Sequence, residues 1–364
     1  MRRARPMLSL LLALAMFWPE HAHAQDEDTE YETVVTSSRG EEAAFRSTRA
    51  ISVVGRKGLR ERQPETTPEA LQDSVGLYMQ RTNLAGGAPI LRGMLGPQVL
   101  LLVDGVRLNN AITRLGPNQL LNTVDPYQIQ RVEVLRGPGS VLYGSDALGG
   151  VINIITRKPG FNPRRAWDLG AEVAGRFNSA SVGAAGHASL SGHLRSVGLR
   201  VGGTFKRMGD LTGGSDTGLQ PFTGYTEGNA DLSAAWWITD QSQLRLGYAL
   251  TRQDDAHRTD RSTPRDFRRL TDQDRDLLTL AYSHDLKGAP VDRVNATLSF
   301  HSQRELRERF RLDMDRVERE RDEVSTLGAA LVLGSDLPWN NSLTYGLDLY
   351  HDWVASSGER AAIS

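Results

Sequence analysis

The residues whose types could support chemistry do not form a catalytic arrangement. The glycines of the stretch 137–144 lack the spacing of a dinucleotide-binding loop, and no helical pattern follows them, so we expect no phosphate binding there. His187 and His193 would share one face of a strand, but they lie too far apart to bind one metal ion. The acidic residues between 254 and 276 lack the spacing of a calcium-binding loop. We therefore expect no catalytic residue, no metal site and no cofactor, and we expect that the protein is not an enzyme.

Composition and charge narrow the class of protein further. The chain of 364 residues has 43 basic and 44 acidic side chains, so its near-neutral balance gives no reason to expect a nucleic-acid partner. It contains no cysteine, which excludes disulfide bonds and thiolate metal sites. The 36 glycines and the scarcity of long helical patterns favour β structure, and the length is sufficient for two domains.

The first 24 residues have the pattern of a secretory signal peptide. Arg2, Arg3 and Arg5 precede an apolar run at 7–17, and Ala22-His23-Ala24 follows it. The apolar run is too short to cross a bilayer as a helix of about 20 residues. We therefore expect export by the general pathway, with cleavage after Ala24.

A glycine-rich stretch between two predicted strands organises the first half of the chain. Residues 130–135 alternate as a strand, and the glycines and proline at 136–139 then force a turn. A second strand begins near Val151, after a loop too rich in glycine to form a packed helix. Upstream, Asp104-Gly105 between two apolar runs predicts a two-residue hairpin.

Residues 51–109 are predicted to form a strand, a helix, a strand and this hairpin. Thr67 is a plausible N-cap for the helix, with Pro68 at its first position. Leu71, Val75 and Tyr78 would then lie on one face of a helix of about three turns.

Together with Leu91-Arg92-Gly93 and the run 99–109, these stretches closely resemble the plug domain of TonB-dependent outer-membrane receptors. The resemblance extends over roughly residues 30–159. It implies an α+β plug domain inside a transmembrane β-barrel, and an energised periplasmic partner, TonB with ExbB and ExbD. A small α/β domain with tight hairpins is the alternative interpretation.

The segment that follows the predicted cleavage site resembles the TonB box of this family. The box residues would be Glu32, Thr33, Val34, Val35 and Thr36. TonB captures such an extended peptide by adding it as a strand to its own sheet, and this requires β propensity and no proline. An ordinary edge strand could have the same sequence, so the box rests on its position upstream of the plug motifs.

The resemblance also implies roles for plug residues. Arg92 and Arg136 match family positions at which plug arginines pair with barrel glutamates and lock the plug in place, since a guanidinium group can bind both oxygens of a carboxylate. Loops at 84–89 and 109–118 would point out of the barrel mouth and contact the ligand. The predicted contact residues are Leu84, Ala85, Ala88, Asn110, Thr113, Arg114 and Asn118. Ordinary surface residues are the alternative for each of them.

Beyond Pro159 the sequence alternates between apolar and polar residues with a period of two, which is typical of an outer-membrane barrel with a lipid side and a lumen side. The nine segments lie near 167–176, 181–192, 196–207, 224–238, 242–253, 273–286, 291–304, 319–334 and 341–354. The charged stretch 304–323 could form a solvated helix, but we favour strands that protrude beyond the membrane. The predicted domains are therefore a signal peptide (1–24), a TonB-box segment with its tether (25–42), a plug (43–160) and a partial barrel (161–364).

Nine strands cannot close around such a plug. A plug of about 120 residues is roughly 35 Å across, whereas nine strands about 4.8 Å apart and tilted by about 40° give a radius of only about 9 Å. A plugged transporter needs about 22 strands, so we expect the chain to be truncated relative to a complete transporter. We expect an open, curved sheet with unpaired edges near residues 170 and 350, which would not insert stably by itself.

The function that the resemblance implies is active uptake of a scarce, bulky nutrient across the outer membrane of a Gram-negative bacterium. The chain is expected to act as a monomer in contact with outer-membrane lipid. A ferric siderophore ranks first as ligand, ahead of haem, cobalamin or a saccharide. Haem ranks lower because the plug has no histidine after cleavage, which leaves His257 in a long loop without a plug partner. The alternative function is a non-transporting ligand-binding or interaction protein.

Overall fold

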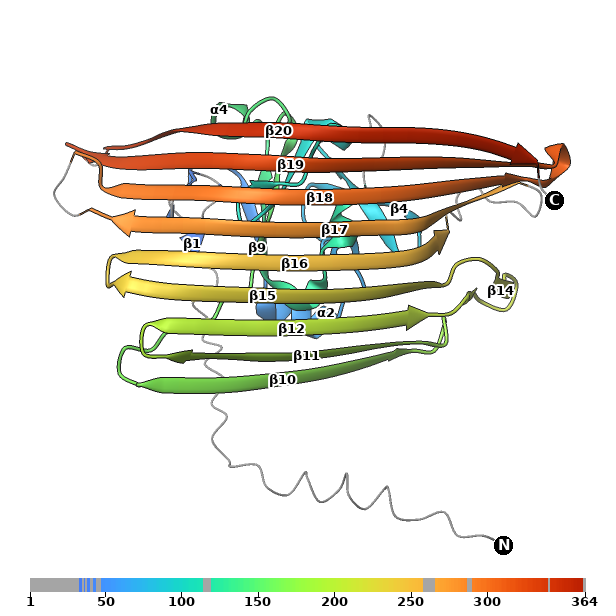
Figure 1. Cartoon of the computed structure of the whole chain (residues 1–364), viewed down its shortest axis with the longest axis horizontal. Helices are drawn as coiled ribbons and strands as arrows, with labels where there is room; N and C mark the ends of the chain where they lie inside the picture. The colour runs from blue at the N-terminus through green and yellow to red at the C-terminus, as the bar shows by residue number, and fades with distance from the viewer. Residues whose placement is uncertain are drawn as a thin grey trace, which may run out of the picture.

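The computed structural model describes residues 33–34, 36, 38–39, 42–43, 47–113, 119–257, 266–286, 290–339 and 341–362. The predicted signal peptide and most of the predicted box segment lie outside these residues. The described chain forms a large antiparallel sheet and a small mixed α/β domain that lies against one face of it (Figure 1). Among the described helices, none is both long enough and apolar enough to cross a membrane.

The large sheet has nine strands in sequence order, each antiparallel to the next. They are β10 (Trp167–Asn178), β11 (Gly183–Leu194), β12 (Val197–Met208), β15 (Tyr225–Thr239), β16 (Ser242–His257), β17 (Asp266–Asp285), β18 (Arg293–Arg311), β19 (Arg316–Leu337) and β20 (Asn341–Ala362). Successive residues of β11 and β12 alternate between buried and exposed positions, because neighbouring side chains point to opposite faces of a sheet.

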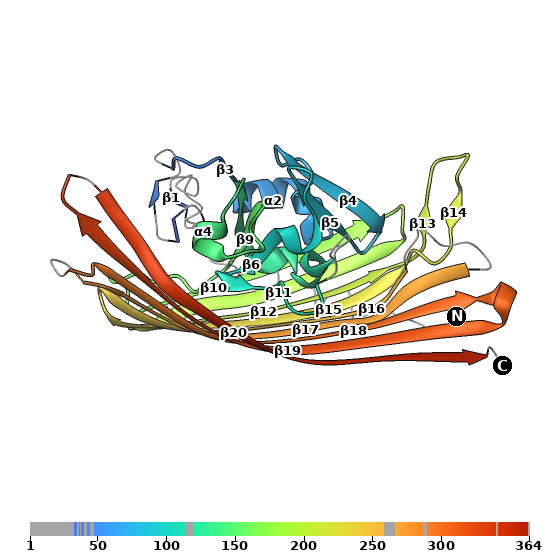
Figure 2. The ribbon, with the colours of Figure 1, turned by 90° about the horizontal axis from the view of Figure 1, so that it is seen from above.

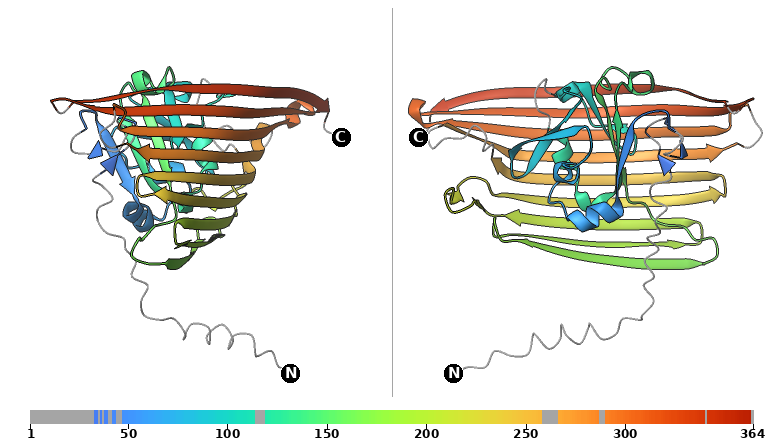
Figure 3. Two further views of the ribbon diagram at one scale, coloured as in Figure 1. Left: turned by 60° about the vertical axis from the view of Figure 1, so that its left-hand side comes forward. Right: turned by 180° about the vertical axis from the view of Figure 1, so that it is seen from behind.

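This sheet is curved and open. The plug domain lies on its concave side (Figure 2), and β10 and β20 are its two edges. Figure 3 shows, from two further sides, that β10 and β20 do not meet. The predicted fold class, an α+β plug followed by about nine antiparallel strands in an open sheet, is therefore confirmed, as are the edges expected near residues 170 and 350.

The charged stretch 304–323 forms strands and not the alternative helix. β18 continues to Arg311 and β19 begins at Arg316, with the 3-10 turn η8 (Leu312–Met314) between them. Ion pairs link these two strand extensions, including Arg307–Asp322 at 2.6 Å and Arg319–Glu308 at 2.8 Å. The dense charges of mixed sign thus pair across strands, as opposite charges do in a sheet.

The two ends of the sheet differ in their connections. The links 195–196 and 240–241 lie at one end, which we call the short-turn end. The longest described link, 209–224, lies at the opposite end, which we call the long-loop end. The link 209–224 carries the hairpin of β13 (Leu211–Thr212) and β14 (Leu219–Gln220), which projects from the sheet in Figure 2.

The plug is built on a five-stranded sheet in the order β3-β8-β9-β6-β7. Its strands are β3 (Ile51–Gly55), β6 (Val99–Val103), β7 (Val106–Arg107), β8 (Ile129–Arg136) and β9 (Gly150–Thr156), and only β6 and β9 pair in parallel. A separate hairpin joins β4 (Leu77–Asn83) and β5 (Gly86–Leu91). Short helical segments complete the domain: α2 (Arg56–Arg62), α3 (Thr67–Ala70), α4 (Ser140–Tyr143), η4 (Gly96–Gln98), η5 (Leu120–Thr123) and η6 (Pro126–Gln128). Fully buried apolar side chains from several of these elements, such as Leu71, Leu101 and Ile152, form the core.

The predicted hairpin at Asp104-Gly105 is confirmed. Both residues have positive φ angles, 49° and 81°, which is the requirement of a type I′ turn. The predicted turn after β8 is also present, and Gly137 adopts a φ of 112° there. The loop that follows is not free of helix as expected, because 140–143 form one helical turn, α4.

The predicted three-turn helix from Thr67 is wrong in length. α3 spans only four residues, and its N-cap is Thr66, whose hydroxyl accepts a hydrogen bond from the backbone N–H of Glu69. Gly76, with a φ of 75°, turns the chain into strand β4. Leu77 and Met79 are buried while Tyr78 is 67% exposed, so the period-two pattern of the strand overrides the helical spacing. Sequence reasoning also missed helix α2.

Candidate functional site

The predicted TonB-box segment lies beside the plug at the short-turn end of the sheet (Figure 1). Thr33 and Val34 form strand β1 (Thr33–Val34), which pairs with β2 (Glu42–Ala43). Glu32 and Val35 lie outside the described residues. The assignment of the box stays a prediction, but its described part is paired within this chain and is not an isolated strand.

Thr36, the last residue of the predicted box, is fully buried in the plug. Its backbone N–H and its hydroxyl both donate to the carboxylate of Glu133, at 2.8 and 2.6 Å. The side chain of Asn153 donates to the Thr36 hydroxyl at 3.1 Å, and the Tyr143 hydroxyl donates to its carbonyl at 2.9 Å. Burial raises the pKa of Tyr143, so this hydroxyl remains a donor. β8, β9 and α4 therefore hold one residue of the segment from three sides.

Arg39, three residues further along, links the same segment to the large sheet. Its guanidinium group makes two hydrogen bonds to the carboxylate of Asp348 on β20, at 2.6 and 2.9 Å. It also donates to the carbonyl of Leu142 and lies 5.1 Å from the centre of the Tyr143 ring. Burial alone would lower the pKa of Arg39, but the hydrogen bonds and charge of Asp348 outweigh it and raise the pKa.

Two further residues on the same face of β20 contact the plug. The guanidinium carbon of Arg107 lies 5.4 Å from the centre of the Tyr350 ring. The backbone N–H of Ala111 donates to Asp352 at 2.8 Å. Because side chains alternate along a strand, Asp348, Tyr350 and Asp352 point to one face. This face of β20 therefore contacts the box tether, the hairpin strand β7 and the loop after it.

The first predicted ligand loop packs against the large sheet. Leu84 and Ala85 form the turn between β4 and β5, while Ala88 lies within β5. Ala85 and Ala88 are each only 1% exposed. The turn packs with side chains from the long-loop ends of four strands, Ala185, Met208, Tyr225 and Ala256. The turn therefore lies at the long-loop end of the sheet, and ligand contact by these residues stays a prediction.

The second predicted ligand loop also touches the sheet. The side chain of Asn110 donates to Gln303 on β18 at 2.8 Å, and its backbone N–H donates to the hydroxyl of Thr113 at 2.9 Å. Arg114 and Asn118 lie outside the described residues. The predicted role of this loop is untested by these contacts.

The predicted lock residues Arg92 and Arg136 lie close together. Arg136 donates a hydrogen bond to the carbonyl of Val75 at 3.4 Å. The guanidinium group of Arg92 lies beside Gly137, the residue after Arg136, so closely that a Cβ atom at position 137 would be 3.1 Å from its Nη1. Within the described part of the chain, neither arginine forms an ion pair with a carboxylate. Their pairing with barrel glutamates stays a prediction.

Other arginines, which sequence reasoning missed, do bind the large sheet. Arg56 and Arg157 of the plug both pair with Glu172 on β10, at 2.6 and 2.9 Å. Burial and then the neighbouring charge of Arg157 lower the pKa of Arg56 to about 10. The one signal in the sequence for this contact was the carboxylate of Glu172, at an inward position of a predicted barrel strand. No local pattern indicated its partners, which lie 116 and 15 residues away in the chain.

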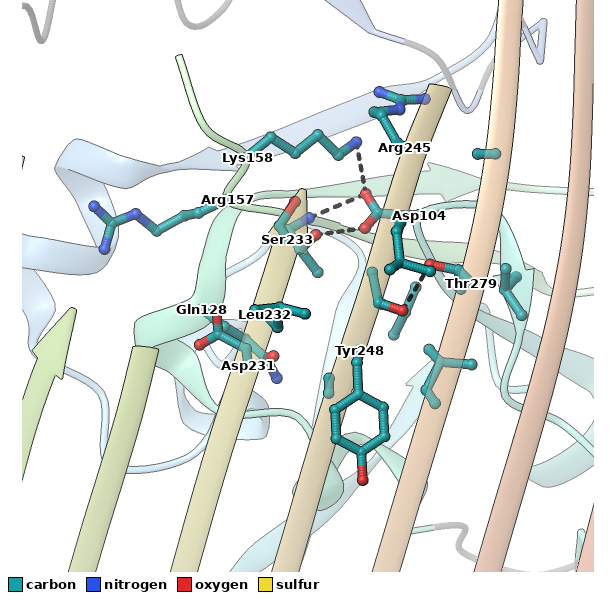
Figure 4. Close-up of a pocket in the computed structure, with 18 of the residues that line it drawn as sticks. Asp104, Gln128, Arg157, Lys158, Asp231, Leu232, Ser233, Arg245, Tyr248 and Thr279 are labelled. Carbon is teal, nitrogen blue, oxygen red and sulfur yellow. Dashed lines mark hydrogen bonds and ion pairs between the residues drawn. The ribbon is translucent and has the colours of Figure 1, made fainter. Parts of the chain in front are cut away.

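A pocket of about 90 Å³ lies between the β6–β7 hairpin and strands β15 to β18 (Figure 4). Asp104 at the hairpin tip pairs with Lys158 at 3.0 Å and accepts hydrogen bonds from the backbone N–H and the hydroxyl of Thr156. Burial raises the pKa of Asp104, but the charge of Lys158 and the hydrogen bonds of Thr156 outweigh it and lower the pKa. The opposite wall contains small residues, including Gly247 and Thr279. The hairpin tip is thus fixed to the segment that leads into β10.

Comparison with known proteins agrees with this architecture. The profile of the TonB-dependent Receptor Plug Domain family matches residues 43–151. The chain is 40% identical over 159 residues to the iron-regulated outer membrane virulence protein of Vibrio cholerae serotype O1, covering 42% of this chain and 24% of that protein. It is 32% identical over 169 residues to the vitamin B12 transporter BtuB of Vibrio vulnificus, covering 46% and 27%. It is 30% identical over 221 residues to the ferric aerobactin receptor of Klebsiella pneumoniae, covering 57% and 29%.

Solved structures show the same fold. The copper transporter OprC superposes with a TM-score of 0.68 at 18% identity, covering 85% of this chain and 47% of that one. The Serratia marcescens hemophore receptor HasR gives a TM-score of 0.72 at 18% identity, covering 86% and 46%. The chain thus spans about a quarter of the curated relatives and about half of these structures. The relatives are named as transporters and receptors, in agreement with the expectation that the chain is not an enzyme. The matched profile shows that residues 43–151 form a TonB-dependent receptor plug domain, and the relatives and the fold show that the chain is similar to TonB-dependent outer-membrane receptors over the plug and part of the β-barrel.

Proposed function

We propose that this chain takes part in the active uptake of a scarce, bulky nutrient across the outer membrane of a Gram-negative bacterium. In this proposal residues 1–24 are a signal peptide, 25–42 the TonB-box segment, 43–160 the plug and 161–364 part of the barrel. TonB, energised by ExbB and ExbD in the inner membrane, captures the box at Glu32–Thr36 and pulls on the plug. The receptor acts as a monomer.

The observation that carries the proposal is the attachment of the box segment to both the plug and the sheet. Thr36 is bound by Glu133 inside the plug, and Arg39 is bound by Asp348 on β20. A pull on this segment therefore acts directly on β8 and on the contact between plug and sheet. Such a connection is what a receptor needs if force at its N-terminal segment is to displace its plug.

The two faces of the large sheet support an outer-membrane location. Leu190, Leu199 and Phe205 are 58%, 49% and 62% exposed on the convex face, whereas His187 and Lys206 are buried on the face that carries the plug. An apolar outer side and a polar inner side are typical of membrane barrels. Trp236 and Trp353 are also exposed on strands of this sheet, as the aromatic residues of a membrane-interface girdle are.

A ferric siderophore is the ligand class that we propose. One relative is named as an iron-regulated protein and another as a receptor for ferric aerobactin. Cobalamin is the second candidate, because other relatives are named as vitamin B12 transporters. Haem ranks below both, since the sequence has no histidine between His23 and His187 and the plug thus cannot supply an imidazole ligand.

The experiment is an uptake assay in the native host with radiolabelled ferric aerobactin and radiolabelled cyanocobalamin, each with and without a protonophore. We expect accumulation of the iron complex that depends on this gene and stops when the protonophore is added. Accumulation of cyanocobalamin alone would select the second candidate. Binding of either compound without energy-dependent accumulation would support the alternative of a non-transporting binding protein.

A further inference from the structure

A buried group of charges joins the plug to the sheet at a position that the family resemblance does not indicate. Lys206 on β12 has its ammonium group 3.3 Å from Asp125 of the plug and 2.8 Å from Glu227 on β15. It also donates to the backbone carbonyl of Glu65 in the plug at 3.1 Å. The side chains of Lys206, Asp125 and Glu227 are only 2%, 3% and 1% exposed.

Neighbouring polar side chains of the large sheet donate hydrogen bonds to the carboxylates around this group. The Thr204 hydroxyl donates to Asp125, and the side chains of Asn229 and Gln253 donate to Glu227 at 2.7 and 2.9 Å. Around the plug residue Glu65, the Tyr225 hydroxyl donates to the carboxylate at 2.9 Å, and Arg176 lies 3.7 Å away. Residues of β10, β12, β15 and β16 therefore surround this part of the plug.

Such a group is hard to separate once it has formed. Removing one partner from a buried ion pair is strongly destabilising, because the other charge remains in an environment without water. Moving Asp125 away from Lys206 would leave the Asp125 carboxylate without its counter-charge unless water entered along the interface, whereas Lys206 would keep its pair with Glu227. The contact is thus stable as a unit and opposes sliding of the plug along β12.

The contacts on the opposite side of the plug are weaker. The side chains of Arg39 and Asp348 are 15% and 25% exposed, and the hydrogen bond from Ala111 to Asp352 is exposed to solvent. Water can replace these partners as they separate, so they resist a pull less than the Lys206 group does. The plug is therefore held unequally, firmly by β12 and β15 and loosely by β20.

We propose that Lys206 and Asp125 are the lock that holds the plug on the barrel wall, and that the plug separates first from β20 when the box is pulled. The polarity of this lock is the reverse of the one predicted for Arg92 and Arg136, since here the barrel supplies the cation and the plug supplies the carboxylate. The separation step rests on the proposed transport function. The lock itself does not, and it can be tested without transport.

The lock is tested by the entry of vancomycin, which is too large for general porins, into strains with single chromosomal substitutions. Asp125→Asn removes the plug charge and leaves the Lys206–Glu227 pair of the barrel intact, so the barrel is expected to fold. Lys206→Met removes the shared cation, and Lys206→Arg keeps a positive charge. The matched control is Arg200→Met, which breaks the buried ion pair between Arg200 on β12 and Asp231 on β15, so that both partners belong to the sheet.

We expect a several-fold rise in vancomycin sensitivity for Asp125→Asn and Lys206→Met, and none for Lys206→Arg or Arg200→Met. Equal receptor amounts in the outer membrane are checked by immunoblot. Unchanged sensitivity in both lock variants, or an equal rise in Arg200→Met, would overturn the lock. These outcomes do not depend on which ligand is carried or on whether transport occurs.

The order of separation is tested by cross-linking, which the absence of native cysteine makes specific. Asp125→Cys with Thr204→Cys allows a link across the lock, and Arg107→Cys with Tyr350→Cys allows a link between the plug and β20. After treatment with a short bifunctional thiol reagent, we expect the 125–204 link to abolish vancomycin entry and to leave energy-dependent uptake intact. We expect the 107–350 link to stop uptake, while the untreated pair transports. Loss of uptake caused by the 125–204 link would show that the plug leaves β12 during transport and would overturn the proposal.

Discussion

The hydroxyl group of Thr36 donates a hydrogen bond of 2.6 Å to the carboxylate of Glu133, a side chain that is fully buried in the plug. The backbone N–H of Thr36 donates to the same carboxylate oxygen. One buried acid thus anchors the end of the predicted TonB box. Any partner that draws out this segment has to replace both donors or leave the acid without them.

The first prediction concerns this anchor. Thr36→Val keeps the shape of the side chain and removes the hydroxyl donor to Glu133, and hydrogen bonds to charged groups contribute about 1.5–3 kcal/mol. We therefore expect a soluble TonB fragment to bind the purified, ligand-free receptor about tenfold more tightly, since tenfold corresponds to about 1.4 kcal/mol. Isothermal titration calorimetry measures this affinity, with Ser47→Ala as a control outside the anchor. Equal affinities for wild type and Thr36→Val would show that the hydroxyl does not hold the box.

The second prediction concerns Arg39 and Asp348. Either Arg39→Gln or Asp348→Asn breaks the pair between the box tether and β20, so we expect each to raise the affinity for the TonB fragment several-fold. The double substitution should add little to the larger single effect, because both changes remove the same interaction. The pair is partly exposed, so a higher salt concentration should shrink the difference from wild type. Fully additive effects would mean that the two residues act independently.

The third prediction is a pH dependence at Asp104. Because the pKa of Asp104 is lowered in the folded protein, its stabilising contribution is present above the pKa of an unfolded aspartate, about 3.9. This stabilising contribution is lost as the pH falls through the pKa of Asp104 in the folded protein, which is lower than that of the unfolded chain. We expect Asp104→Asn to lower the free energy of unfolding by about 1 kcal/mol at neutral pH. The difference from wild type should disappear under strongly acidic conditions.

This pH dependence can be measured by urea unfolding of the solubilised protein over a range of pH values. Asparagine tolerates the positive φ angle of 49° at this position, so the substitution isolates the charge from the turn. Lys158→Met removes the partner and should behave in the same way above the pKa. A difference between wild type and Asp104→Asn that does not change with pH would contradict the assignment.

The sequence predicted the large sheet well because a single rule, alternation with a period of two, operates along every strand. The same rule explains the error at the predicted helix, since Leu71, Val75 and Tyr78 satisfy a helical spacing by coincidence. Gly76 adopts a positive φ there, and the buried pair Leu77 and Met79 decides for a strand. A local sequence pattern thus determines whether a segment is a helix or a strand only where the adjoining residues do not favour the other structure.

The contacts between plug and sheet could not be predicted in the same way. Lys206 and Asp125 are 81 residues apart, counted from their numbers in the sequence, and nothing near either residue indicates the other. Arg39 and Asp348 are separated by 309 residues. Such pairs are set by how the whole sheet curves around the plug. The Arg92 and Arg136 lock came from the resemblance alone, and it remains untested.

The most direct test of energised uptake through the box is Val34→Pro. Proline removes a backbone donor and cannot continue a strand pairing, so TonB should no longer capture the segment. The decisive measurement is the initial rate of radiolabelled ferric aerobactin uptake by the native host, with surface binding of the same complex measured in parallel. We expect uptake to fall to the level of protonophore-treated wild type while binding stays normal. Normal uptake by the Val34→Pro strain would contradict the account.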